Sequence, residues 1–498
     1  MKTIIYTLIF LEAVSFTANA QSKIADYKQK NNFIMHMHQN QILKSPAQNF
    51  GLKINSYWED VNAPHVINNS HVVQIQVPSP NAVWAHVDFD TTVYIANQFI
   101  RTADGGRTWR IDSVDAPNGY GLSSIAGIDA NTCYAAMYDA FNYGGAMFKT
   151  IDGGNTWKQV QPGKVYSANS FPDFVYFFDA QHGLSVGDDD LVDTSRLEIY
   201  TTSDAGKTWQ RVPDKNLPPT QGYAFSTNFN PYAFFENRFW FTAGDTYGNN
   251  YIYRSDDFGQ HWQQFPYTAT SFNAFSFSDK KNGLGVGLNF GVGSYEVETH
   301  DGGKTWSDKN FTGYPMGLFL TVIPYTHTFV STMPYGLAPV SGSSYSNDGG
   351  ATWKLINTSS DFQPFALAFL NPLIGWCGRA DSPDPNGGMY KWKYHFSLDN
   401  NSLITNDANV SLIEKNNLNN TINARLYPNP VKDVITVNGL NASVKTTLSL
   451  FNISGKLIQQ AIANSANYSF SIQKLAAGNY YITIESNKQF TTLKFVKE

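Results

Sequence analysis

Apolar and polar residues alternate in short runs over most of the chain, and turn residues separate the runs. The pattern is clearest in FVYFFDAQHGLSVGD from Phe174, AFSFSDKKNGLGVG from Ala274 and ALAFLNPLIGWCG from Ala366. Each stretch reads as an apolar strand, a short turn and a second strand. Period-two alternation between turn signals is typical of β-strands. The sequence therefore predicts an all-β protein.

A second pattern, Ser/Thr-x-Asp-x-Gly-x-x-Trp, recurs between these strand pairs, as in TADGGRTW from Thr102 and THDGGKTW from Thr299. We call it the box. Its six aspartates are Asp104, Asp152, Asp204, Asp257, Asp301 and Asp348. Their spacing of 44 to 53 residues is typical of the four-stranded blades of a β-propeller.

The number of blades follows from the two ends of the repeat. The strand pair from Ala366 comes after the sixth box and continues through GGMYKWKYHF without a box of its own, so a seventh blade would lack an outer strand. Near the front, YWEDVN from Tyr57 is similar to the segments that follow the box tryptophans. We therefore predict that Trp58 to Val61 supplies the missing strand. Closing the ring in this way would remove open sheet edges.

The boxes resemble the Asp-box, or BNR, repeats of sialidase-like, sortilin-like and photosystem II assembly-factor-like propellers, over residues 52–396. The resemblance implies a seven-bladed β-propeller here. An aspartate in the turn between two outer strands can accept backbone N–H bonds, and its glycine can adopt positive φ. The tryptophan is then free to pack between blades. The six box aspartates are accordingly predicted to be structural.

Four further segments flank or follow the repeats. Residues 1–20 combine Lys2, an apolar run and Ala18-Asn19-Ala20, which predicts a secretory signal peptide. Residues 21–51 form a leader segment, and its MHMH stretch, with His36 and His38, lacks further metal ligands nearby. Residues 397–424 are Asn-rich and predict a linker. Residues 425–498 alternate again around Gly-centred turns and predict a small β-sandwich.

This tail resembles the type A C-terminal sorting domain of the type IX secretion system of Bacteroidetes-type bacteria. The matching stretches are Pro428-Asn429-Pro430, Ser454-Gly455-Lys456, Leu475 with Gly478 and Tyr480, and the closing KFVKE. The resemblance implies that the type IX machinery is a partner and that the protein is secreted or held at the outer-membrane surface. An ordinary terminal β-sandwich used for binding is the alternative.

Charge, hydropathy and cysteine content exclude several kinds of partner and structure. The net charge of -5 and the absence of a Lys/Arg-rich stripe argue against nucleic acid and anionic membranes. After the signal peptide no stretch has about 20 consecutive apolar residues, so no transmembrane segment is predicted in the mature chain. Cys133 and Cys377 fall in similar strands of non-adjacent repeats, and a disulfide between them is not expected.

No complete catalytic constellation can be read from the sequence. HExxH and GxSxG are both missing, as is the early Arg-Ile-Pro-like motif expected of a sialidase. We therefore predict no catalytic residue and favour a binding or scaffold module for a glycan or protein ligand. A sialidase-like or glucanase-like glycoside hydrolase that uses two loop carboxylates stays open, as does an assembly factor that holds partner proteins.

Blade topology indicates where a ligand would bind. The boxes and the turns between first and second strands share one face, so the loops between second and third strands lie on the opposite face. Asp139, Tyr143 and Tyr335 lie in such loops. The predicted ligand-binding residues are Asp188, Asp189, Asp190, Asp193, Arg196, Asp245, Tyr247, Arg379 and Asp381. Acids with tyrosines suit a glycan or peptide, and no cofactor is predicted, although such oxygen ligands also suit Ca²⁺. Solvated turn residues are the alternative for each of them.

Overall fold

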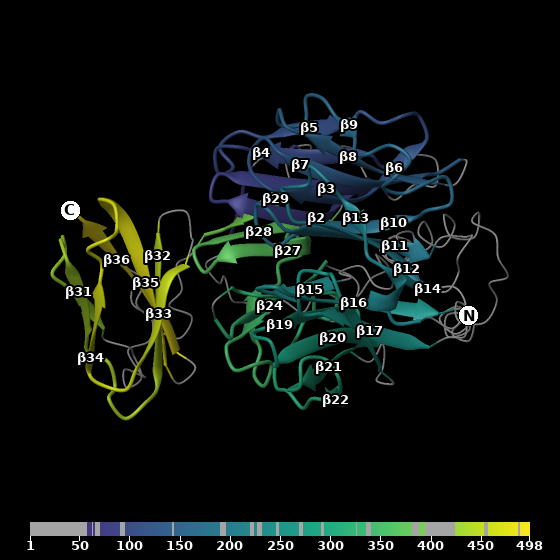
Figure 1. Cartoon of the computed structure of the whole chain (residues 1–498). Helices are drawn as coiled ribbons and strands as arrows, with labels where there is room; N and C mark the ends of the chain where they lie inside the picture. The colour runs from purple at the N-terminus through teal and green to yellow at the C-terminus, as the bar shows by residue number, and fades with distance from the viewer. Residues whose placement is uncertain are drawn as a thin grey trace. The chain divides into compact units, whose positions relative to one another are not determined.

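The computed structural model of the 498-residue chain describes residues 57–61, 63–64, 70–89, 95–141, 144–189, 196–219, 224–226, 232–245, 249–267, 272–289, 293–324, 326–334, 340–380, 388–393, 424–452, 457–486 and 489–498. The predicted signal peptide, the leader with its two histidines and nearly all of the predicted linker lie outside this part of the chain. The principal boundary between two compact units falls after Trp392 (Figure 1).

The first unit consists of seven antiparallel sheets, which we number as blades in chain order (Figure 1). Blades 1 to 3 are β2 (Ser70–Ser79), β3 (Ala82–Phe89), β4 (Gln98–Thr102) and β5 (Arg110–Ser113); β6 (Tyr120–Gly127), β7 (Cys133–Asp139), β8 (Gly145–Thr150) and β9 (Lys158–Gln159); and β10 (Pro172–Phe177), β11 (Gly183–Asp189), β12 (Leu197–Thr202) and β13 (Gln210–Arg211). A 3₁₀ turn, η1 (Asp214–Asn216), follows blade 3.

Blades 4 to 6 continue the meander. They are β14 (Ala224–Ser226), β15 (Tyr232–Phe235), β16 (Arg238–Asp245), β17 (Asn250–Ser255) and β18 (Trp262–Pro266); β19 (Ala274–Phe277), β20 (Gly283–Asn289), β21 (Gly293–Thr299) and β22 (Ser307–Asp308); and β23 (Phe319–Val322), β24 (Phe329–Met333), β25 (Gly342–Ser346) and β26 (Lys354–Asn357). In blade 4 the inner strand is in two pieces, because β14 and β15 both pair with β16.

Blade 7 is assembled from both ends of the repeat. It contains β27 (Pro364–Asn371), β28 (Ile374–Arg379), β29 (Met389–Trp392) and, as its outer strand, β1 (Trp58–Asp60). Trp58 pairs with Trp392, and its indole N–H donates to Ser343 Oγ of blade 6 at 3.1 Å. On the other side of the blade, Trp376 packs edge-on against Trp109 of blade 1, with ring centroids 5.4 Å apart. The predicted seven-bladed ring and its closing strand are confirmed.

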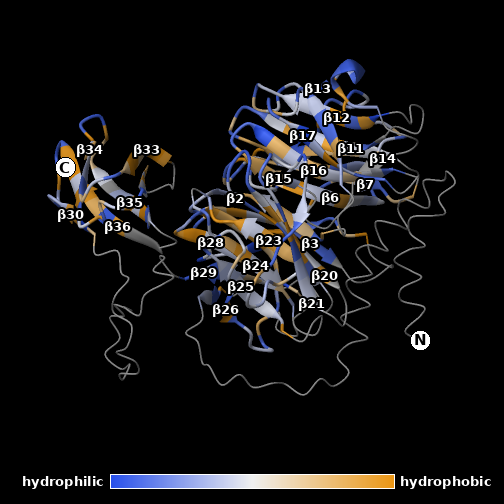
Figure 2. Ribbon diagram, turned by 90° about the horizontal axis from the view of Figure 1, so that it is seen from below, coloured by the Kyte–Doolittle hydropathy of each residue, from blue (hydrophilic) through white to orange (hydrophobic). Residues whose placement is uncertain are grey.

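Apolar side chains fill the spaces between blades, and Figure 2 shows apolar residues within the strands of both units. Between blades 1 and 2, Trp84 and Phe99 pack with Ile125 and with the box tryptophan Trp157. Trp157 is edge-on to Trp84, with centroids 6.5 Å apart, so the box tryptophan does pack between blades. Cys133 and Cys377 are both buried free thiols, as expected.

The aspartate of each box accepts hydrogen bonds from its own turn, and blade 2 shows the arrangement. Thr150 Oγ1 and Thr156 Oγ1 donate to the two carboxylate oxygens of Asp152 at 2.8 and 2.7 Å, and the Thr156 N–H donates at 3.0 Å. These bonds lower the pKa of Asp152 to about 2. Gly153 has a φ of 75° and its N–H donates to Asn131 O, which ties the box to the inner turn of its own blade.

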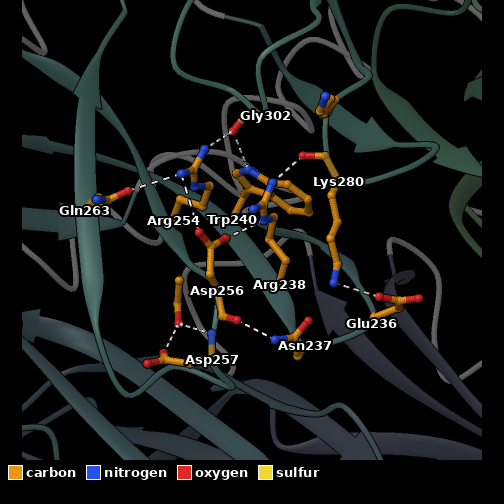
Figure 3. Close-up of polar contacts among 12 residues, drawn as sticks. Glu236, Asn237, Arg238, Trp240, Arg254, Asp256, Asp257, Gln263, Lys280 and Gly302 are labelled. Carbon is orange, nitrogen blue, oxygen red and sulfur yellow. Dashed lines mark hydrogen bonds and ion pairs between the residues drawn. The ribbon is translucent and has the colours of Figure 1, made fainter.

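A cation from the preceding blade binds the outward carbonyls of several boxes. Figure 3 shows this at the seam between blades 4 and 5, where Arg254 Nη1 and Trp240 Nε1 both donate to Gly302 O, at 3.1 and 2.9 Å. Arg238 stacks over Trp240 and pairs with Asp256. The backbone of the blade 5 box is thereby held by side chains of blade 4.

Arg254 directly precedes the box serine, and the same position carries a cation in other blades. Arg101 lies over Trp84 and donates to Gly153 O and Ala130 O of blade 2. At the ring closure, Lys391 lies over Trp376 and donates to Gly105 O of blade 1 at 2.7 Å. Cation–π contact and a charge-assisted hydrogen bond act together at each of these seams.

The seam between blades 3 and 4 uses aromatic packing instead. Thr201 precedes the box of blade 3, so no cation is available there. In the next box Phe258 replaces the usual first glycine and adopts a φ of 61°, which is unfavourable for a side chain of this size. Its ring stacks on His182 of blade 3 with centroids 4.3 Å apart. At this seam the ring stacking of Phe258 on His182 makes the contact between blades that an arginine or lysine makes at other seams.

The seam between blades 5 and 6 contains a buried carboxyl group. Glu296 is 2% exposed, and neither of its carboxyl oxygens forms a hydrogen bond. The indole N–H of Trp353 is nearby but not in hydrogen-bonding geometry. Burial raises the pKa of Glu296 to about 8. Four other blades have an apolar side chain at this position: Phe99, Met147, Ile199 and Ile252.

The second unit is a sandwich of two antiparallel sheets. One contains β30 (Arg425–Tyr427), β31 (Val434–Asn438) and β34 (Asn467–Ser471), and the other contains β33 (Leu457–Ala463), β32 (Thr446–Asn452), β35 (Gly478–Ser486) and β36 (Gln489–Lys497), in these spatial orders. Ile435, Leu448, Phe470, Ile482 and Phe495 are among the fully buried residues between the sheets. The predicted C-terminal β-sandwich is confirmed.

Replacing Trp58 by Ala should lower the free energy of unfolding by about 3–5 kcal/mol, because a 3% exposed indole is removed from the last blade. Denaturant unfolding of the full chain measures it. Glu59→Ala, on the same strand but exposed, is the control and should change stability by less than about 0.5 kcal/mol. Equal unfolding midpoints for Trp58→Ala and the parent would contradict the closing role of β1.

Replacing Glu296 by Met should stabilise the protein by an amount that grows with pH. Because the folded state raises the pKa of Glu296 from 4.5 to about 8, its carboxyl group is neutral in the fold, and stability is lost as pH rises from 4.5 to about 8. The limit of this loss is about 5 kcal/mol. Melting temperatures of Glu296→Met and of the parent, measured from pH 4 to pH 9, give the difference in stability between them at each pH.

Glu298→Gln is the control, since Glu298 lies on the same strand but pairs with Lys309. Lys309, Glu298 and Asp348 are the charged groups that act on Glu296, and the control alters one of them. If the difference in melting temperature between Glu296→Met and the parent stays constant over this pH range, Glu296 is not a buried acid.

Candidate ligand-binding face

The face opposite the boxes is where the second strand of each blade ends. Box turns and inner turns share one face, since Gly105 N–H donates to Asn81 O at 2.9 Å, so antiparallel strands place the other strand ends opposite. We call this the loop face. In four consecutive blades an aspartate lies at the last or next-to-last position of the second strand: Asp88, Asp139, Asp188 and Asp245.

Three of these four acids are buried rather than solvated. Asp88, Asp188 and Asp245 are 6%, 5% and 3% exposed. Asp88 pairs in register with His71 of the inner strand, which is itself 5% exposed and edge-on to Phe365 of blade 7. Carboxylates with so little exposure are fixed in position by the strands that carry them.

Tyrosines accompany the acids. Burial and then the charge of Asp88 raise the pKa of Tyr138 on blade 2. Burial and Asp139 raise the pKa of Tyr120 in the same way. Acids from blade 1 and blade 2 thus lie close enough to tyrosine hydroxyls to act on them. Such a set offers hydrogen-bond acceptors and hydroxyl groups at one face of the ring.

The predicted ligand-binding residues divide into three groups. Asp188 lies at the loop face as predicted, and Asp189 ends β11 beside it. Asp190, Asp193, Tyr247 and Asp381 lie outside the described residues. Arg196, Asp245 and Arg379 are described, and each makes contacts within the protein.

Those contacts show how each of the three is held. Asp245 accepts hydrogen bonds from the Asn249 N–H at 3.0 Å and from its side-chain amide at 2.9 Å, so it closes its own loop. Arg196 Nε donates to Asp214 O at 2.9 Å. Arg379 pairs with Asp60 at 3.3 Å and so ties β28 to the closing strand. Arg196 therefore contacts the segment after blade 3, and Arg379 contacts the outer strand of blade 7. The two arginines do not lie at one common site.

Sequence reasoning missed Asp88 and His71. The signal for Asp88 was present: the stretch AHVDF ends a second strand as AMYDA, SVGDD and TAGDT do. Aligning the second strands of successive blades, rather than the loops after them, would have found it. No motif marked His71, whose place depends on the pairing of β2 with β3.

A contact across the ring closes its middle. Tyr232 of blade 4 accepts hydrogen bonds from Gln74 and Gln76 of blade 1, at 3.0 and 2.9 Å from their Nε2 atoms. Gln74 Nε2 also lies 3.1 Å from Ser124 Oγ of blade 2. Because blades 1 and 4 are not neighbours, this cluster crosses the ring axis. Burial raises the pKa of Tyr232 to about 12, so it remains a neutral hydroxyl.

Metal ligands and surface recesses are the two further features that could mark a site. Within the described part of the chain, no three His, Cys, Asp or Glu side chains gather closely enough to hold a metal ion, and the Ca²⁺ hypothesis stays a prediction. A recess of about 510 Å³ lies beside the ring closure, between β1 and the blade 1 box, and Glu59, Arg107, Trp109 and Lys391 are among its lining residues. The sequence analysis did not anticipate this recess.

Comparison with known proteins decides the role of the second unit. Residues 425–498 match the family described as "Secretion system C-terminal sorting domain". The second unit is a sorting domain. It marks the protein as one that is secreted or held at the outer-membrane surface. Within the described residues no helix is long and apolar enough to cross a membrane.

Solved structures include distant likenesses. One is YCF48 from Cyanidioschyzon merolae, at 16% identity over 67% of this chain and 98% of that chain, with a TM-score of 0.44. Another is PorZ, a surface component of the type IX secretion system of Porphyromonas gingivalis, at 12% identity over 86% of this chain and 59% of that chain, also with a TM-score of 0.44. No curated protein matches the chain.

Replacing Tyr232 by Phe should lower the free energy of unfolding by about 0.5–1.5 kcal/mol, because the half-buried amides of Gln74 and Gln76 lose their hydrogen bonds to the hydroxyl while the ring is kept. Denaturant unfolding measures the loss. Tyr314→Phe, at a 51% exposed position, is the matched control and should leave stability unchanged. The same stability for Tyr232→Phe and the parent would show that the cross-ring contact contributes nothing.

Proposed function

We propose that this protein is an exported β-propeller that binds a glycan or protein ligand at its loop face and does not chemically transform it. The sorting domain delivers the propeller beyond the outer membrane, and the propeller is the part that acts there. The proposal depends mainly on one observation: in four consecutive blades an aspartate lies within the last two residues of the second strand, namely Asp88, Asp139, Asp188 and Asp245.

The repeated acids suit a ligand that donates hydrogen bonds. Carboxylates accept bonds from sugar hydroxyls, from backbone N–H groups and from cationic side chains. Their low exposure means that little side-chain entropy is lost when a ligand binds.

Binding is favoured over hydrolysis because the carboxyl group with a raised pKa does not lie at the loop face. A glycosidase needs one carboxyl group with a raised pKa to protonate the leaving group. The described carboxyl group whose pKa is raised to about 8, Glu296, is 2% exposed between blades 5 and 6 and packs against the box of blade 6. At that place it cannot reach a ligand on the loop face.

The test is a glycan-array screen and a surface-protein capture with the full chain, followed by calorimetry on the strongest ligand. Replacing Asp88 and Asp188 together by Asn keeps their size and removes their charge. The variant should bind at least about tenfold more weakly, since each charge-assisted hydrogen bond is worth roughly 1.5–3 kcal/mol. Melting curves check that the variant is folded.

Asp308→Asn is the matched control, because it removes one exposed charge from an outer strand of blade 5. It should bind as the parent does. Equal affinity in the Asp88/Asp188 variant would remove the loop-face acids from the proposal. Release of reducing sugars at enzymatic rates from any bound glycan would replace it with the glycoside hydrolase alternative.

A further inference from the structure

The three-stranded sheet of the sorting domain has an outer surface that carries exposed apolar and small polar residues, with Arg425 at one end. In the three-stranded sheet, Tyr427 lies opposite Thr436, which lies opposite Ser469, and Val434 lies opposite Ser471. We call these five residues the β31 face. Tyr427 is 70% exposed and Val434 46% exposed, although the alternate residues of the same strands, such as Ile435 and Val437, are fully buried. Folding of the sandwich therefore gives no reason for the apolar residues of the β31 face.

The motif residues of the sorting domain are used inside it. Asn429 acts as a bridge to the last strand: its Nδ2 donates to Lys494 O at 3.1 Å, and its Oδ1 accepts from the Val496 N–H at 3.0 Å. Tyr480 is 8% exposed and donates its hydroxyl to Ala476 O at 2.9 Å. Leu475 packs on the core. Asn429, Tyr480 and Leu475 therefore have a structural role within the domain.

The Asn429 bridge has a consequence for the β31 face. It fixes the turn that begins directly after Tyr427, and so it holds Tyr427 at the end of β30. The other exposed apolar pair of the domain, Ile458 and Ile462, lies on β33. This strand is at the opposite edge of its sheet from β36, to which Asn429 binds. The motif therefore supports the β31 face and not the β33 surface.

We propose that the β31 face is the surface by which the secretion machinery recognises the sorting domain. The inference rests on the sorting role of residues 425–498. The partner surface covers the Tyr427 ring with apolar groups and offers hydrogen bonds to the hydroxyls of Thr436 and Ser469. Thr436 Oγ1 and Ser469 Oγ lie 2.8 Å apart, so they present one paired polar site beside the tyrosine. A rigid tyrosine next to small polar residues is a frequent composition for a binding hot spot.

The experiment follows export of the full chain in a bacterium that has this secretion system. The test variant is Tyr427→Ser with Val434→Ser, and the matched control is Ile458→Ser with Ile462→Ser. Both replace two exposed apolar residues of the same domain by serine. Loss of a hot-spot tyrosine weakens an interface by about 30-fold or more. The test variant should therefore accumulate in the periplasm, whereas the control should reach the surface and the medium as the parent does.

Two further measurements make the result decisive. Melting curves of the purified full-length variants should match the parent, because none of the four residues belongs to the buried core. Removal of residues 425–498 tests the sorting role itself. If that deletion blocks export while Tyr427→Ser with Val434→Ser is exported normally, the β31 face is not the recognition surface. Equal loss of export in the control would also overturn the proposal.

Discussion

Every blade of this propeller has two apolar faces, and neither can be covered by the blade itself. A row of such sheets is stable only when each has a neighbour on both sides, so the row must close into a ring. The closing seam depends on a strand of three residues, Trp58–Asp60, that pairs with β29. Trp58 contacts blade 6 through Ser343, and Lys391 on the paired strand contacts blade 1 through Gly105. The remaining architecture requires this junction.

The box turns explain how sheets so poor in charge adhere to one another. Each aspartate accepts the bonds of its own turn, so the turn is rigid before it meets another blade. Its outward carbonyls then accept a cation from the preceding blade, as with Arg101 and Arg254. Where the cation is missing, Phe258 and His182 stack instead. The box carboxylates are therefore used within their own turns.

In the sorting domain, too, the motif residues make contacts within the domain. Residues that carry the family resemblance, such as Asn429 and Tyr480, are spent on holding the sandwich together. Tyr427, which belongs to none of these motifs, is 70% exposed. In both units, a recurring sequence signature marks the scaffold, and the surfaces that we propose for binding lie outside that signature. A search for motifs alone therefore finds the fold before it finds the function.

Sequence alone was enough to predict seven blades, the closing strand at Trp58 and the C-terminal sandwich, because these depend on local alternation and on a repeat that recurs along the chain. The site was predicted less well. Asp188 lies at the loop face, but Arg196 donates a hydrogen bond to Asp214 O and Arg379 pairs with Asp60. The place of His71 beside Asp88, the contact of Tyr232 with Gln74 across the ring and the burial of Glu296 depend on strand register and on which blades face each other. Such contacts join residues distant in the chain, and only the tertiary structure decides them.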